Sequence, residues 1–258
     1  MSESKVFMFE GDDPEMQGAS EKARATFRYF WRELAWENRR IIPAVDLACV
    51  KAAFTDGKSQ KRKADEPQAE HMWFDNVDFD GRFVSGTLLN APNWLKSIQQ
   101  GDPVRIRFDE IIDWMYVIDG KVYGAYTVNL MRSRMDKRER KEHDAAWGLD
   151  FGDPDQIRLV PDQKSGSVIG EHPMSENMGP SLKKALAEDS SMMNEMDDRG
   201  WTILHHQALA GSLASVKILL ERGADVNAET TNGMTPLQLA KSLGWEKVTA
   251  LLAGKGGK

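Results

Sequence analysis

The chain has 258 residues, with 34 lysines and arginines against 40 aspartates and glutamates, and 41% of its residues are hydrophobic. This composition is sufficient for two modest cores, and the net charge of −6 gives no overall field that would attract nucleic acid. The single cysteine, Cys49, excludes an intrachain disulfide and is typical of a reducing compartment. The apolar run near the start, Val6–Phe9, is too short for a signal peptide or a membrane span, so we expect a cytoplasmic protein.

The first elements expected are a helix and a strand. Residues 1–19 are interpreted as an N-terminal extension. Across Ser20–Arg40, apolar side chains recur at steps of three and four residues, which predicts a helix with one apolar face, and Pro43 closes it. Leu47–Phe54 predicts the first strand, and the polar stretch 56–69 predicts a loop.

Two hairpins and another strand follow. Asp80-Gly81 and Asp119-Gly120 each stand between apolar runs, which is the pattern of a two-residue β-hairpin turn. Apolar residues alternate with arginine in Val104–Phe108, as in a half-buried strand. Five or six strands with one helix against them predict an α+β domain over residues 20–160, built as a curved antiparallel sheet or a small barrel.

A charged helix and a linker complete this part of the chain. Ser133–Asp136 has the spacing of a capping box, which predicts a helix that reaches about Trp147. Residues 161–180 are rich in Gly, Ser, Pro and Met and are interpreted as a linker before residues 181–258.

The C-terminal part contains an internal repeat. Gly200–His205 recurs 33 residues later as Gly233–Gln238, and further residues match at the same interval, namely Gly211 with Gly244, Leu219 with Leu252, and Asn194 with Asn227. This period and these residues resemble the ankyrin repeat, with about two and a half copies in residues 181–254. The resemblance implies an all-α ankyrin domain, in which Thr202 and Thr235 cap helix N-termini.

An ankyrin stack usually recognises a protein through its finger turns and inner helices. We expect a partner to bind at the variable positions of that surface, which are Arg199, Trp201, His206, Met234 and Leu239. Since so few repeats bury little apolar surface, we also expect the stack to dock on the α+β domain and to cover residues such as Leu182, Leu186 and Trp201.

A second resemblance rests on short boxes between residues 70 and 127. They are Glu70–Trp73, Gly86–Asn90, Gly101-Asp102, Ile112–Tyr116 and Gly124–Thr127. These boxes are similar to the bacterial domain-of-unknown-function family typified by YegJ proteins, over roughly residues 40–132. The family has no assigned chemistry, so the resemblance implies a fold and no mechanism.

The boxes also supply the candidate chemistry. A histidine oriented by a carboxylate can act as a general base, and aromatic residues can line a ligand groove. The candidates for such a groove are His71, Trp73, Asp113, Trp114 and Tyr126. The alternative, which we favour, is that His71 lies at a strand edge and that both tryptophans belong to the core.

The sequence predicts neither a metal site nor a cofactor. Glu139 and His143 share a helix face but are only two potential ligands, and His205 and His206 are adjacent and point apart. There is no phosphate loop, nucleophile elbow or paired-cysteine motif. We therefore expect a non-enzymatic protein that binds a protein partner, and neither nucleic acid nor a membrane. Two alternatives remain open, an immunity or antitoxin-like protein that blocks a bacterial toxin, and an enzymatic or ligand-binding YegJ-like domain.

Overall fold

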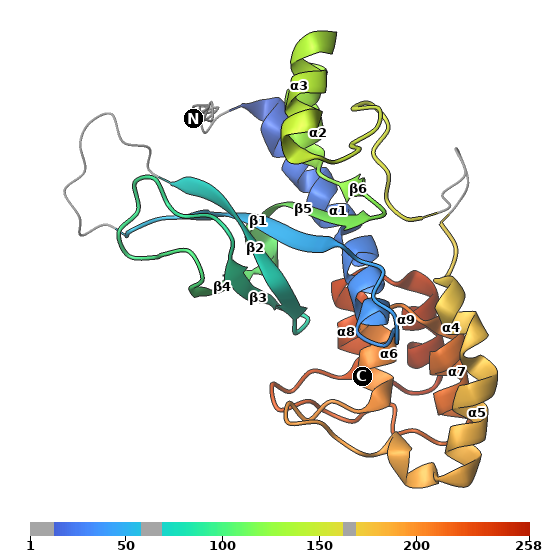
Figure 1. The fold of residues 1–258 in the computed structure, drawn as a ribbon. Coiled ribbons are helices and arrows are strands. Elements are labelled where there is room, and N and C mark those ends of the chain that lie inside the picture. The colour runs from blue at the N-terminus through green and yellow to red at the C-terminus, as the bar shows by residue number, and fades with distance from the viewer. Residues whose placement is uncertain (1–12, 58–68, 162–168) are drawn as a thin grey trace.

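The computed structural model describes residues 13–57, 69–161 and 169–258. Figure 1 shows a sheet crossed by one long helix, with a bundle of short helices at the C-terminal end of the chain. Most of the loop expected at 56–69 and part of the linker expected at 161–180 lie outside the described residues.

The long helix α1 spans Pro14–Glu37 and confirms the first expected helix, although it begins six residues earlier than Ser20. Its start signal is local, because the Asp13 side chain accepts hydrogen bonds from two backbone N–H groups of the first turn and Pro14 occupies the first helical position. The apolar stripe that contains Phe27 and Phe30 is fully buried against the sheet.

The sheet contains six antiparallel strands in the order β4-β3-β2-β1-β5-β6. They are β1 (Leu47–Phe54), β2 (Glu70–Phe79), β3 (Phe83–Leu88), β4 (Pro103–Arg107), β5 (Ile111–Ile118) and β6 (Lys121–Gly124). In the part of the chain that the structure describes, β4 and β6 form two edges, so the sheet is open rather than a closed barrel. Both Asp-Gly hairpins are confirmed, between β2 and β3 and between β5 and β6.

The two faces of the sheet are covered differently. One face packs on α1, while the β1, β5 and β6 part of the other face packs on α2 (Tyr126–Ser133) and Phe151. A short 3-10 turn, Phe108–Glu110, joins β4 to β5. The charged helix α3 spans Lys137–Trp147, and its capping box is formed by Asp136 and Glu139 rather than by Ser133–Asp136, because Ser133 still belongs to α2.

The C-terminal helices form three consecutive pairs. They are α4 (Pro173–Asn177) with α5 (Gly179–Glu188), α6 (Ile203–Leu209) with α7 (Leu213–Glu221), and α8 (Pro236–Ser242) with α9 (Glu246–Gly254), and a 3-10 turn at Ser190–Met193 follows α5. Helix α4 lies within the stretch interpreted as a linker. Thr202 and Thr235 are the N-caps of α6 and α8, and the leucines at equivalent positions of the pairs share one buried cluster.

Candidate functional site

The strongest candidate site is the surface formed by α6, α8 and the turns that precede them, where an ankyrin stack recognises partners. Three of its expected partner-binding residues, Trp201, Met234 and Leu239, are 3%, 5% and 0% exposed. They belong to the same apolar cluster as Trp31 of α1 and Phe79 of β2. The α+β domain of the same chain therefore covers most of this surface.

The turn between β2 and β3 packs closely against the inner helix α8 and the turn before it. Gly81 stands at this turn with φ +93°, and a Cβ atom added there would lie 2.6 Å from Leu239 Cδ2 and 3.0 Å from Met234 Cε. A side chain at this position would strike the ankyrin surface. Beside the turn, Arg199 Nη1 donates to Asp78 Oδ2 at 2.7 Å. This ion pair links the ankyrin repeats to β2.

Helix α1 supplies the other half of the contact. Arg28 Nη1 donates to the carbonyl of Gly244 at 3.0 Å, and the Tyr29 ring meets the Trp245 ring edge-on at 6.2 Å. Trp245 in turn donates through Nε1 to the carbonyl of Leu209 at 2.9 Å. Arg28 and Tyr29 of α1 thus contact the turn between α8 and α9, in the last repeat of the stack.

A buried polar contact ties α1 to the segment before α4. His172 Nε2 lies 3.3 Å from Glu33 Oε2, and the His172 ring stacks on Trp36 with 5.6 Å between ring centroids. Burial pushes the pKa of Glu33 upward, but the close contact with His172 and the positive charge of Arg40 outweigh this effect, so the pKa of Glu33 is below its ordinary value. Glu33 is therefore ionised at neutral pH, and its charge is balanced inside the contact.

The expected docking of the stack is confirmed for Trp201 and wrong for the first repeat. Leu186 is buried in the separate cluster of the stack, where Leu182 also packs, so these leucines stabilise the repeats themselves. Of the five residues expected to bind a partner, only Arg199 and His206 keep substantial exposure, at 41% and 32% of their side chains.

An exposed apolar loop connects α1 to β1. Ile41 and Ile42, between α1 and β1, are 100% and 81% exposed. The loop is fixed nonetheless, because Glu37 Oε1 accepts hydrogen bonds from the backbone N–H groups of Ala44 and Val45 at 2.9 and 3.2 Å. Sequence reasoning missed this pair, although two isoleucines directly before Pro43 and outside any periodic pattern were a visible signal.

A charge near the end of α1 acts on α6. Burial lowers the pKa of His206, the positive charge of Arg39 lowers it further, and the hydrogen bond to Asp197 opposes both. Arg39 lies two residues before Ile41, so the segment that leads into the loop is close enough to α6 for its charge to act on His206. We call the surface made of Ile41, Ile42, Arg199 and His206 the α6 edge.

The five residues of the expected groove do not converge. Trp114 and Tyr126 face α1, where Trp114 Nε1 donates to Ala23 and the Tyr126 hydroxyl accepts from Thr26. Trp73 lies on the opposite face of the sheet from Trp114, as does the exposed His71. Strand β1 lies between His71 and Asp113, which places their Cα atoms about 12 Å apart from strand spacing and rise.

Asp113 has a structural role instead. It is fully buried, and its carboxylate accepts from the backbone N–H groups of Trp114, Tyr126 and Thr127 at 2.8–2.9 Å and from the Thr127 hydroxyl at 2.6 Å. Burial raises the pKa of Asp113, against the effect of these hydrogen bonds and of Lys51. The carboxylate therefore satisfies the first N–H groups of α2, which begins after Ala125 in a left-handed conformation.

The described residues, 13–57, 69–161 and 169–258, contain neither a metal-type cluster nor a helix fit to span a membrane. Within these ranges no three His, Cys, Asp or Glu side chains gather as a metal site. None of the helices found there combines the length and the apolar character that crossing a membrane requires. Cys49 is buried, and burial raises the pKa of its thiol well above the ordinary value, which makes it unreactive.

Two protein-family models match this chain, one in each of its two parts. Residues 13–151 match the model of a family described as an uncharacterized protein conserved in bacteria, the domain of unknown function DUF2314. The chain belongs to this family. Residues 174–258 match a model of three ankyrin repeats, in agreement with the three helix pairs and with the α+β plus ankyrin architecture.

Individual relatives show the same two parts. A putative ankyrin repeat protein of Neisseria meningitidis serogroup B is 44% identical over 254 residues, which is 98% of each chain. The uncharacterized protein YegJ of Escherichia coli K12 is 29% identical over 97 residues, 38% of this DUF2314 protein and 58% of YegJ. The resemblance to YegJ proteins is thereby confirmed for the N-terminal half.

Other similarities concern the repeats alone. The human NAD-capped RNA hydrolase NUDT12 is 36% identical over 78 residues, 30% of this chain and 17% of that enzyme. The matched length is that of an ankyrin segment, so the similarity extends to repeats and not to hydrolase chemistry.

Proposed function

We propose that this DUF2314 protein is a non-catalytic, cytoplasmic binding protein that holds a protein partner at the α6 edge. The ankyrin repeats favour protein recognition as a class. The five candidate groove residues do not share a pocket, which argues against a catalytic site in the N-terminal domain. They are His71, Trp73, Asp113, Trp114 and Tyr126.

The observation that carries the proposal is the loop with Ile41 and Ile42. An exposed aliphatic pair lowers solubility unless another surface covers it. Because Glu37 fixes the backbone after the pair, the loop loses little conformational entropy when a partner binds. Arg199 and His206 are the partly exposed polar members of the proposed interface. An apolar centre with a polar rim is the usual composition of a protein interface.

This proposal revises the expected interface in one respect. Trp201, Met234 and Leu239 are held by the α+β domain, so a partner that used them would have to separate the two domains. Binding at the α6 edge requires no such separation.

The test is affinity enrichment from the source organism with the full chain as bait. The variant I41D/I42D should lose the partner that the wild type enriches, because two charges would replace the apolar centre of the interface. Met178→Asp is the matched control, since Met178 is 37% exposed on the stack and lies outside the α6 edge. Equal recovery by all three baits would place the interface elsewhere.

The narrower hypothesis of an immunity protein has only the acidic net charge of −6 in its favour. A toxin gene adjacent to the gene of this protein would support it, and a toxin should then be the protein that I41D/I42D fails to enrich.

A further inference from the structure

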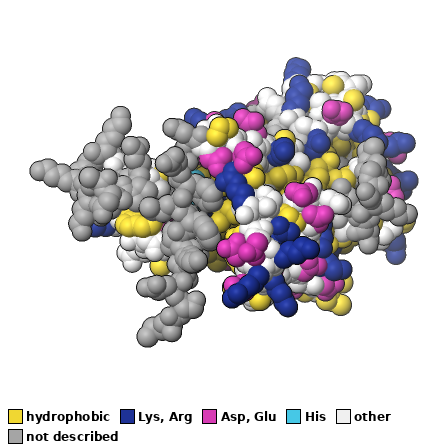
Figure 2. All heavy atoms as spheres, turned by 90° about the horizontal axis from the view of Figure 1, so that it is seen from above, with side chains coloured by type: hydrophobic (Ala, Val, Ile, Leu, Met, Phe, Trp, Pro, Cys, Tyr) yellow, Lys and Arg dark blue, Asp and Glu magenta, His cyan; other side chains and the backbone are white. Residues whose placement is uncertain are grey.

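A shallow depression of about 600 Å³ lies between α3 and the segment 148–152. It is lined by four cationic side chains, Arg132, Lys137, Arg140 and Lys141, and by two carboxylates, Asp144 and Asp150, together with small and backbone groups. Figure 2 looks onto this end of the molecule and shows Lys and Arg side chains gathered among Asp and Glu.

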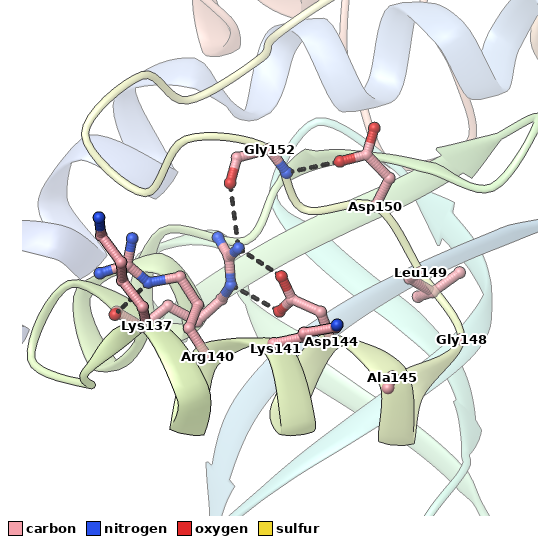
Figure 3. A pocket seen from close by; sticks show the side chains of 10 residues that line it. Lys137, Arg140, Lys141, Asp144, Ala145, Gly148, Leu149, Asp150 and Gly152 are labelled. Carbon is pink, nitrogen blue, oxygen red and sulfur yellow. Dashed lines mark hydrogen bonds and ion pairs between the residues drawn. The ribbon is translucent and has the colours of Figure 1, made fainter.

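Both carboxylates of the depression already have partners. Asp144 binds Arg132 through two parallel hydrogen bonds, Nε to Oδ1 at 2.8 Å and Nη2 to Oδ2 at 2.6 Å. Arg132 is 1% exposed and also donates to Asn129 and to the carbonyl of Gly152, so its charge is compensated. Figure 3 shows the acceptors Asp144 and Gly152 of these hydrogen bonds. Asp150 pairs with Arg158, which lies outside the lining.

The other three cations are left without carboxylate partners. Arg140 donates to the backbone carbonyls of Arg132 and Met135, which orient its guanidinium without neutralising it. Among the described residues, neither Lys137 nor Lys141 has a carboxylate within ion-pair distance. The depression thus carries three uncompensated positive charges in a chain whose net charge is −6.

The remaining acidic residues of α3 are engaged elsewhere. Glu139 accepts from the backbone of Asp136 in the capping box, and Glu142 pairs with Arg138. Another depression, between α4, α5 and α7, shows the contrast, because its two lysines, Lys183 and Lys217, share their lining with Glu176 and Glu221. Two lysines beside two glutamates are an ordinary balanced surface, whereas the α3 depression is not balanced.

We propose that the α3 depression binds a small ligand that carries two or three linked phosphate groups. Residues 137 and 141 are one helical turn apart, so the Cα atoms of the three cationic residues lie within about 6 Å along the helix axis. A terminal phosphate group brings up to two negative charges and three non-bridging acceptor oxygens, and an internal one adds a further negative charge, so a short phosphate chain can pair with three neighbouring cations. The volume lies within the range of small-ligand sites. This inference does not depend on the proposed protein partner.

The experiment titrates the isotope-labelled full chain with tripolyphosphate at low ionic strength, following backbone amide NMR shifts and the heat of binding. We expect saturable binding with shifts confined to residues 137–152. The variant K137Q/K141Q should bind about tenfold more weakly or worse, because two of the three free charges are lost. Glutamine is a good helix former, so α3 should persist, and the NMR spectrum reports this directly.

K183Q/K217Q is the matched control, since it removes the same number of charges from the balanced depression. It should bind tripolyphosphate as the wild type does. Equal weakening in both variants would show attraction by net charge alone and overturn the proposal, as would shifts that map away from α3. Binding of a polyglutamate peptide without any response to tripolyphosphate would assign the depression to an acidic protein segment and would also overturn it.

Discussion

The two sides of the ankyrin stack differ in what they contact. On the inner side, α6 and α8 bury Trp201, Met234 and Leu239 against α1 and the β2–β3 turn. On the outer side, α5 and α7 leave Lys183 and Lys217 in water beside glutamates. The side that ankyrin proteins usually offer to a partner is therefore occupied by the same chain, while the polar side stays open.

This difference indicates how a short array becomes stable. The stack has three helix pairs, and the first begins with the five-residue α4. So short an array buries little apolar surface, and the free energy gained from that burial is small beside the backbone entropy lost on folding. The α+β domain supplies the missing surface. The inner face then acts as part of a common core.

The largest effect should follow from removing that surface altogether. Residues 176–258 expressed alone should show weak helical circular dichroism and no cooperative melt, because Trp201, Met234 and Leu239 would be exposed together. The full chain under the same conditions is the reference. A sharp two-state transition of the fragment near the melting temperature of the full chain would show that the stack stands alone and that the contact is incidental.

A single truncation in the contact should have the next largest effect. Trp201→Ala should lower the free energy of unfolding by about 3–5 kcal/mol, as expected when a buried aromatic side chain leaves a cavity. Trp147→Ala is the control, since Trp147 is 41% exposed on α3 and should cost about 1 kcal/mol or less. Urea denaturation of both variants measures the difference, and similar costs would contradict a shared core at Trp201.

The turn between β2 and β3 allows a finer comparison. Gly81→Ala and Gly120→Ala both place alanine at a positive φ in an Asp-Gly hairpin, so both incur about 1–2 kcal/mol of backbone strain. Only at Gly81 does the new Cβ meet the ankyrin surface, since nothing lies within 4 Å at Gly120. Gly81→Ala should therefore cost about 1–3 kcal/mol more in thermal or urea unfolding.

Leu239→Ala should relieve part of this clash when it is combined with Gly81→Ala, because Leu239 Cδ2 is the nearest atom. The double-mutant cycle measures this coupling, and strictly additive costs would mean that the turn does not press on the stack.

The smallest effect expected is a pH dependence that arises within the stack. His205 Nδ1 lies 3.0 Å from the backbone nitrogen of Thr202, which donates to it, and Nε2 lies 2.9 Å from the carbonyl of Ala228, so the ring is held neutral. Burial lowers the pKa of His205 below its ordinary 6.5, with the backbone contacts opposing. The unfolded chain therefore takes up a proton first as pH falls below about 6.5, and stability decreases.

His205→Gln should remove this contribution while keeping the cap, because the next repeat has Gln238 at the same position, where it accepts from the backbone N–H of Thr235. Between pH 7.5 and 5.5 the variant should lose about 1 kcal/mol less of its unfolding free energy than the wild type. The pKa values of His71 and His206 are lowered as well, so the unfolding free energy of the variant should still depend on pH in part. Identical pH profiles would show that His205 is protonated without cost.

The sequence alone determined the features that depend on local physics. The 33-residue period, the Thr202 and Thr235 caps and the two Asp-Gly turns each depend on interactions among near neighbours, and each is present in the structure. Helix α1 was also predictable from the spacing of its apolar residues. Local sequence signals did not reveal α2, because its N-terminus is capped by Asp113, which is distant in the sequence.

Only the tertiary structure decided which surfaces remain free. Trp201 and Leu239 stand at positions where an ankyrin repeat varies, and no local signal distinguishes contact with another protein from contact with the same chain. The proposed groove failed for a similar reason, since strand order and register place Trp114 and Trp73 on opposite faces of the sheet. The unpaired charge of Lys137 and Lys141 also emerged only in three dimensions, because Arg132 and Arg158 occupy the carboxylates nearby. A pattern along the chain fixes which side chains are apolar or charged, but their partners are fixed by packing between segments far apart in the sequence.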